Sequence, residues 1–206
     1  MRTHSPLPSL IQPLTGPAAG TSNTAAGYLY DNTSDFVTES IKEALRRTKM
    51  LTTLEMARAE FGFYCAHIAL YDGEVEPLHG HTFQVTLRVS GEPDASGMVA
   101  EFSEIKPVMR DAVAPLRRRT LVPGHAPELQ IAPENGSLSI ACGAKRYLLP
   151  AEDVTVLPLA NTTLEALAGY LLNQVLPQLH KTRLVAAELE VSEPPGTAAI
   201  ARAELG

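Results

Sequence analysis

The chain lacks the features that mark several specialised protein classes. No apolar run approaches the roughly 18 residues of a membrane-spanning helix, and the N-terminus has no apolar segment of the signal-peptide type. Two cysteines are too few for a disulfide framework. Lys plus Arg number 17 against 23 Asp plus Glu, and the net charge of −6 argues against nucleic-acid binding, which needs a basic surface. We therefore expect a cytoplasmic protein with no nucleic-acid partner and no membrane partner.

Composition divides the 206 residues into two parts. Residues 1–33 are rich in Pro, Gly, Ser, Thr and Asn without helical or strand periodicity, which indicates a flexible segment. A helix is predicted at 35–48, where apolar side chains recur on one face. We assign 1–53 to an N-terminal extension and 54–206 to a compact domain.

Periodicity predicts the elements of that domain. Alternating apolar and polar residues favour strands at 58–67, 81–90 and 184–193, with a short one at 197–203. Helices are expected at 103–116, with Ser103 as N-cap, and from Thr162, which has capping-box spacing with Glu165. Between the helices, a hairpin insertion is expected at about 123–158. This order indicates an α+β fold whose antiparallel sheet carries the helices on one face.

Three histidines are the candidate metal ligands. His79 and His81 stand in His-Gly-His, and side chains two positions apart on a strand share a face. His67 ends the preceding strand with the parity of that strand's apolar residues. If the two strands pair through the 68–78 loop, the imidazoles meet at one end of one sheet face, and three neutral imidazoles with an open position are typical of catalytic zinc. The alternative is a set of hydrogen-bonded core histidines.

Glu193 is a candidate substrate ligand. It continues the apolar face of the last predicted strand at the point where that face ends. A carboxylate there can accept two parallel hydrogen bonds from the amino-pyrimidinone edge of a pterin or guanine. The alternative is an exposed loop residue before Pro194 and Pro195.

Six short motifs, in order over about residues 54–203, resemble the 6-pyruvoyl-tetrahydropterin synthase and 6-carboxy-tetrahydropterin synthase family. They are Phe63-Tyr64-Cys65-Ala66-His67, Leu78-His79-Gly80-His81, Gly97-Met98-Val99, Glu101-Phe102 with Lys106, Asn161-Thr162-Thr163 with Glu165, and Val191-Ser192-Glu193 before Pro195-Gly196. The 123–158 insertion is similar to that of the longer members.

The resemblance implies the tunnelling fold, in which sheets of several subunits close into a barrel, as a trimer or hexamer. It also implies Zn²⁺ on His67, His79 and His81, and a pterin ring anchored by Glu193. The implied activity is that of a zinc-dependent carbon–carbon or carbon–oxygen lyase acting on the side chain of a reduced pterin, such as 7,8-dihydroneopterin or its triphosphate.

Two departures from the family pattern affect the expected catalytic groups. Val75 stands where many members carry a catalytic cysteine, while Glu76 matches a glutamate-bearing type associated with side-chain cleavage of dihydroneopterin toward 6-hydroxymethyl-dihydropterin. Glu76 is therefore the predicted catalytic base, and the alternative is a solvated loop acid. The family's Asp–His pair after the first helix is missing, because three consecutive arginines, 117–119, follow Leu116.

The departures leave alternatives open. The three arginines are either a solvated helix end or a site for an anionic group. Cys65 is either a small buried residue or a substitute nucleophile near the metal. The whole chain is either a lyase of the family, a member that acts on a different small substrate in a specialised pathway, or a non-catalytic pterin-binding homologue.

Overall fold

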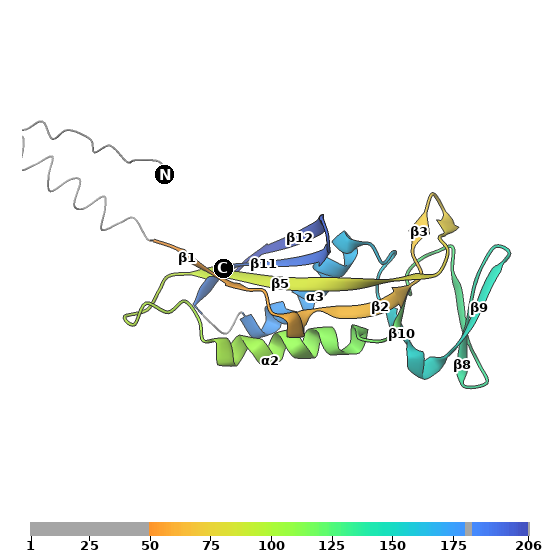
Figure 1. Ribbon diagram of the computed structural model, residues 1–206, viewed down its shortest axis with the longest axis horizontal. Helices are drawn as coiled ribbons and strands as arrows, with labels where there is room; N and C mark the ends of the chain where they lie inside the picture. Colours follow the sequence, from red (N-terminus) through yellow and green to blue (C-terminus); the bar gives the residue numbers. More distant parts are fainter. Residues whose placement is uncertain (1–49, 180–182, 206) are drawn as a thin grey trace, which may run out of the picture. The chain divides into compact units, whose positions relative to one another are not determined.

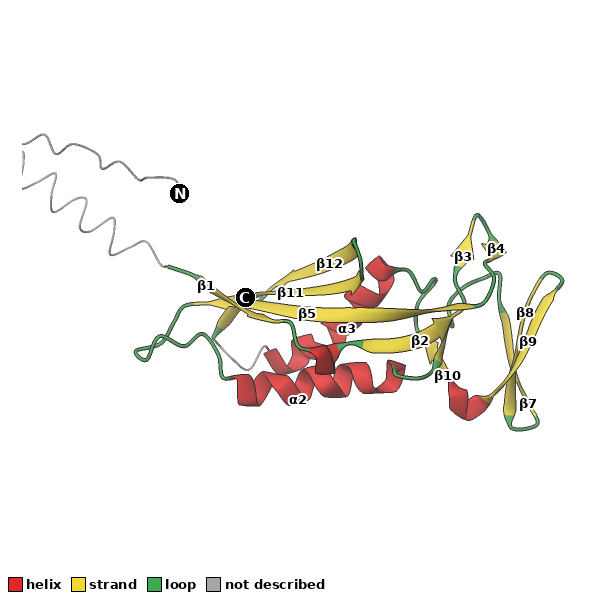
Figure 2. Ribbon diagram, in the orientation of Figure 1, coloured by secondary structure: helices red, strands yellow, loops and turns green. Residues whose placement is uncertain are grey.

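The computed structural model describes residues 50–179 and 183–205. The helix predicted at 35–48, and all but the last four residues of the extension predicted at 1–53, lie outside these residues. The described chain forms a seven-stranded sheet, two helices and two smaller sheets, which are labelled in Figures 1 and 2.

The central strand of the large sheet is β5 (His79–Gly91). On one side it pairs with β2 (Phe63–His67) at its beginning and with β1 (Thr52–Met56) at its end. On the other side it pairs with β11 (Leu184–Glu193), which in turn pairs with β12 (Thr197–Glu204). All of these pairs are antiparallel. The strand β5 thus lies between β1 and β2, from the beginning of the domain, and β11, from near its C-terminal end.

The expectation of a purely antiparallel sheet is wrong at one edge. Here β6 (Thr120–Pro123) pairs parallel with β2, and β10 (Val154–Leu157) pairs parallel with β6. The helix α2 (Phe102–Val113) returns the chain along the sheet after β5, and β6 continues in that direction (Figure 1). Because β5 is antiparallel to β2, a strand that follows this return runs parallel to β2.

The two helices cover one face of the sheet. The odd-numbered side chains of β5 from Phe83 to Val89 are at most 2% exposed, and they form one core with residues of α2 and of α3 (Leu164–Leu179). The helix residues fully buried in this core are Met109, Val113, Leu167, Ala168, Leu171 and Val175. We call the opposite face of the sheet, which carries the even-numbered residues of β5, the open face.

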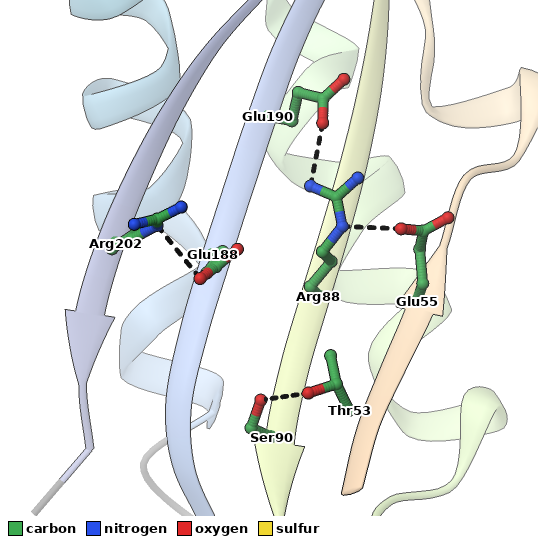
Figure 3. Close-up of polar contacts among 7 residues, drawn as sticks. All are labelled: Thr53, Glu55, Arg88, Ser90, Glu188, Glu190 and Arg202. Carbon is green, nitrogen blue, oxygen red and sulfur yellow. Dashed lines mark hydrogen bonds and ion pairs between the residues drawn. The ribbon is translucent and has the colours of Figure 1, made fainter.

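Polar and charged residues occupy the open face (Figure 3). Arg88 on β5 donates to Glu55 on β1 at 2.6 Å and to Glu190 on β11 at 2.8 Å, and these bonds raise the pKa of Arg88. One strand further on, Arg202 of β12 pairs with Glu188 of β11 at 3.1 Å. Cross-strand neighbours of opposite charge each add a modest stabilisation to the pairing of these strands.

The insertion between the helices forms a three-stranded antiparallel sheet of β7 (Gln130–Glu134), β8 (Ser137–Cys142) and β9 (Lys145–Pro150). Its Ile140 is buried in a second small core with Ile68, Val122 and Val75. Val75 belongs to the short hairpin of β3 (Leu70–Tyr71) and β4 (Glu74–Val75) that precedes β5. The insertion therefore supports the segment that leads into the His-Gly-His motif.

Three local expectations differ from the structure. Residues 59–61 form a 3₁₀ turn, so β2 begins only at Phe63. The cap of α2 is Glu101, without a side-chain hydrogen bond, in place of Ser103. At the start of α3, Thr163 Oγ1 accepts from Ala166 N at 3.3 Å, so the capping residue is Thr163 and the prediction of Thr162 is wrong by one position.

We expect Leu87→Ala to destabilise the protein by about 2–5 kcal/mol, because Leu87 is fully buried at the centre of β5 and its loss leaves a cavity. The matched control is Thr86→Ala on the open face of the same strand, which we expect to change the free energy of unfolding by less than about 0.5 kcal/mol. Urea denaturation at fixed protein concentration measures both. Equal effects would mean that the apolar face of β5 is not the main core.

Candidate metal centre

The pairing of β2 with β5 brings the three predicted histidines together. His67 lies directly opposite His79, and His81 lies opposite Cys65 two residues further along β5. The ring centroids of His67 and His79 are 4.6 Å apart, those of His79 and His81 4.8 Å, and those of His67 and His81 5.0 Å. One nitrogen of each ring lies within 4.8 Å of those of the other two.

The Nδ1 atom of each ring faces an acceptor outside the cluster. His67 Nδ1 lies 3.2 Å from the carbonyl oxygen of Thr162, and His79 Nδ1 lies 2.7 Å from that of Pro77. His81 Nδ1 contacts the Glu193 carboxylate. Carbonyl and carboxylate oxygens only accept hydrogen bonds, so Nδ1 carries the proton in each ring and Nε2 keeps its lone pair.

The cluster as a whole fits a divalent metal ion. The Nε2 atoms of His67 and His79 are only 3.1 Å apart, and both carry lone pairs in this tautomer. Such lone pairs repel one another unless a cation lies between them. Metal-bound histidines commonly donate their second N–H to a carboxylate or a backbone carbonyl, as all three rings do here. Three neutral imidazoles suit zinc, and three ligands leave a position open.

His67 is the most buried member of the cluster, at 6% exposed. Its pKa is lowered, chiefly by burial and then by the neighbouring His79. A lowered pKa keeps the imidazole neutral, which is the form that binds metals. His79 is exposed and His81 intermediate, so the cluster has one buried side and one side open to a ligand.

Two residues before α3 hold the cluster in place, and sequence reasoning assigned neither of them to it. Thr162 is 1% exposed; its hydroxyl donates to Ile68 O at 3.0 Å and lies 3.1 Å from His67 Nδ1. Asn161 accepts from Leu70 N at 3.0 Å and donates to Leu70 O at 2.8 Å. The signal available in the sequence was the polar Asn-Thr-Thr run directly before an apolar helix, which indicates a helix cap and is one of the six family motifs but does not by itself predict a contact with His67.

Glu193 ends β11 beside the cluster, with its side chain 40% exposed. One carboxylate oxygen, Oε1, contacts His81 Nδ1. The sequence pattern predicted a carboxylate at the end of an apolar strand face but no contact with a histidine. Among the described residues, no hydrogen-bond partner occupies the remaining oxygen, Oε2.

Glu76 follows β4 and precedes β5 on the rim of the cluster. Its backbone N–H donates to Ala69 O at 3.0 Å, and its charge acts to raise the pKa of His67. The preceding Val75 is 4% exposed, and the Lys145 ammonium of the insertion donates to Val75 O. The segment that carries Glu76 is therefore held from both sides.

Other candidate residues lie outside the cluster or lack accessibility. Cys65 is 7% exposed in the main core, and burial raises its pKa to about 12, so it fits the packing role and not that of a nucleophile. Arg117 donates to Glu60 O and Arg118 to the Tyr64 hydroxyl, which places neither at the histidines. His125 lies in the connection after β6, where its backbone N–H donates to Leu159 O at 2.9 Å.

Comparison with known proteins identifies the family that this fold and cluster belong to. The pattern of the 6-pyruvoyl tetrahydropterin synthase family matches residues 56–204, which is most of the chain. The chain therefore belongs to the 6-pyruvoyl tetrahydropterin synthase family, and it has the α+β tunnelling fold that the sequence predicts.

Individual relatives agree with this assignment. The 6-pyruvoyl tetrahydropterin synthase of Plasmodium vivax superposes with a TM-score of 0.71 at 29% identity, over 75% of this chain and 99% of the other. The P. falciparum enzyme gives the same TM-score at 28% identity, over 75% and 98%. A Methanocaldococcus jannaschii protein provisionally named 6-carboxy-5,6,7,8-tetrahydropterin synthase is 28% identical over 131 residues, which are 63% of this chain and 80% of that protein.

Two further P. vivax structures are of variants in which a catalytic glutamate is replaced by alanine or by cysteine. Both have a TM-score of 0.71 and 28% identity to this chain. In the part of the chain that the structure describes, neither helix has the length and hydropathy to cross a bilayer.

Proposed function

We propose that the protein is a zinc-dependent lyase that cleaves the side chain of a reduced pterin, such as 7,8-dihydroneopterin or its triphosphate. The observation that carries the proposal is the convergence of three imidazoles whose Nδ1 atoms are all occupied by acceptors. Membership of a family of pterin synthases supports the substrate class. A cytoplasmic location and a trimeric or hexameric assembly remain predictions from the sequence.

In this proposal, His67, His79 and His81 hold the zinc ion through Nε2. Zinc, when bound, supplies a Lewis acid that polarises a hydroxyl or carbonyl oxygen of the substrate side chain. The Glu193 carboxylate orients His81 through Oε1 and accepts from the amino-pyrimidinone edge through Oε2. The ring is thereby anchored next to the metal ligands, with its side chain toward the exposed His79.

Glu76 acts as the base. Its carboxylate accepts the proton of a side-chain hydroxyl, the adjacent carbon–carbon bond breaks to release an aldehyde, and the proton returns to the carbon that stays on the pterin. Atoms and charge balance without an oxidant or a reductant. The catalytic glutamate of the P. vivax relatives supports a carboxylate in this role, as does Val75 in the place of the usual cysteine.

A second candidate is a family member that acts on a different small substrate. The observation that favours it is the replacement of the Asp–His pair by arginines, of which Arg117 and Arg118 are bound to neighbouring residues of β2 and of the turn before it. A non-catalytic pterin-binding protein is the third. Product analysis after incubation with 7,8-dihydroneopterin and with its triphosphate separates the three.

We predict one zinc ion per chain in the purified protein, lost in His79→Ala, because two remaining imidazoles are too few for stable binding. The matched control is His125→Ala, which removes a histidine outside the cluster and should keep the metal. Elemental analysis after gel filtration measures both. Absence of any transition metal from the wild-type protein, or its retention in His79→Ala, would falsify the assignment.

Replacement of the proposed base should slow turnover without affecting the ligands of the metal. We expect Glu76→Ala to lower kcat by about 10²- to 10⁴-fold while zinc content and pterin affinity stay unchanged. Glu74→Ala, which removes an exposed acid from β4 of the same hairpin, is the control and should keep wild-type turnover. Wild-type turnover in Glu76→Ala would place the base elsewhere.

The two roles of Glu193 can be separated by two substitutions. Glutamine keeps an oxygen that accepts from His81 but loses the charge, so Glu193→Gln should weaken pterin binding by about tenfold or more and retain zinc. Glu193→Ala removes both contacts and should also weaken zinc binding, by about 10- to 100-fold. Fluorescence titration with an oxidised pterin measures the affinity.

The control for these variants is Glu188→Gln, which changes a carboxylate of the same strand that faces Arg202 on the open face. We expect it to keep both affinities. If Glu193→Gln and Glu188→Gln bind the pterin as tightly as the wild type, Glu193 is a support for His81 and not an anchor for the ring.

A further inference from the structure

A pocket lies on the open face of the sheet, opposite the face that carries the histidine side chains. Its volume is about 600 Å³, and side chains at even-numbered positions of β2 and β5 contribute to its wall. The histidines have odd numbers on the same strands, and successive side chains of a strand alternate between faces. The polar residues that line the pocket are Tyr64, Thr82, Arg118, Arg119, Thr120 and Asp153, together with His81, whose side chain strand parity places on the opposite face.

Arg118 is fixed at the edge of this pocket. Its backbone is in the left-handed region (φ 56°), and its backbone N–H donates to the backbone oxygen of Tyr64 at 2.9 Å. Its Nε donates to the Tyr64 hydroxyl at 2.7 Å, and the guanidinium carbon lies 5.7 Å from the centre of the Tyr64 ring. These contacts use Nε and one face of the guanidinium, and they leave its two terminal amino groups available to an acceptor.

The pocket is cationic although the chain is acidic. Arg118 and Arg119 bring two positive charges and Asp153 brings one negative charge, against a formal net charge of −6 for the whole chain. Among the described residues, neither arginine forms a salt bridge with a carboxylate, in contrast to Arg88, Arg146 and Arg202. The pocket therefore carries an excess of positive charge, which a bound anion would neutralise.

We propose that this pocket binds a small molecule through an oxyanion, a phosphate ester or a carboxylate. Guanidinium groups bind both kinds of oxyanion through paired N–H donors, and the hydroxyls of Thr82 and Thr120 add donors to the same wall. A nucleic acid does not fit, because it needs an extended basic stripe, whereas this pocket has two arginines beside the acidic Asp153. The site lies beyond the proposed lyase function: although His81 adjoins the pocket, strand parity directs the imidazoles of His67, His79 and His81 to the opposite face of the sheet.

Titration calorimetry of the full chain tests the proposal, with inorganic phosphate in one arm and succinate in the other. We expect saturable binding of one anion per chain for at least one of the two, and the arm that binds identifies the oxyanion. Arg118→Ala and Arg119→Ala should each weaken it by about tenfold, as loss of a charge-assisted hydrogen bond does. Asp153→Asn should strengthen it, because it removes the opposing charge.

Two controls distinguish this pocket from other binding modes. Arg146→Ala removes an exposed arginine of the insertion and should not change the affinity. His79→Ala should also keep anion binding, which separates this site from an anion bound to the metal and makes the result independent of the lyase proposal. Should Arg118→Ala fail to fold, Arg118→Lys and Arg119→Gln retain the backbone and weaken binding in the same direction.

Three results would overturn the proposal. They are the absence of saturable binding of either anion, unchanged affinity in the Arg118 and Arg119 variants, and loss of binding in His79→Ala.

Discussion

The register between β2 and β5 is the constraint on which the site depends. With His67 opposite His79, the three imidazoles share one end of one sheet face. A slip by one residue would turn the β2 side chains to the other face, which would expose Phe63 and remove His67 from its two partners. The register is therefore held by the same buried face that forms the core, and the metal ligands themselves come from β2 and β5 alone.

Packing around this pair explains how the histidines keep one orientation. Thr163 caps α3, and Thr162 directly precedes it. The Thr162 hydroxyl and carbonyl are therefore not used by the helix and lie beside His67. The strand β11 lies on the other side of β5 and ends with Glu193 at His81. Acceptors from three separate parts of the chain thus select the same tautomer in each ring.

The sequence predicts the strands and the histidine cluster well, because period-two alternation is strong in β5 and β11. Both predictions depend only on which residues share a face of a strand. It predicts less of what surrounds them. Parity places Glu193 on the right face, but only the pairing of β11 with β5 shows that it reaches His81. The role of Thr162 could not be predicted, because one residue decides whether a threonine caps a helix or faces a strand.

The parallel edge strands β6 and β10 were also missed, because each is only four residues long and carries no clear alternation. The consequence extends to the arginines, since the turn before β6 holds Arg118 against Tyr64 and so determines which face of the sheet they lie on. A run of three basic residues after a helix does not reveal this by itself.

The central claim is that three imidazoles hold one zinc ion through their Nε2 atoms. X-ray absorption at the zinc edge of the purified full-length protein tests it most directly. The account predicts a first shell containing three imidazole nitrogens and no sulfur, with the imidazole contribution reduced in His67→Ala. A shell that contains sulfur from Cys65 or Cys142, or one without imidazole scattering, would contradict it.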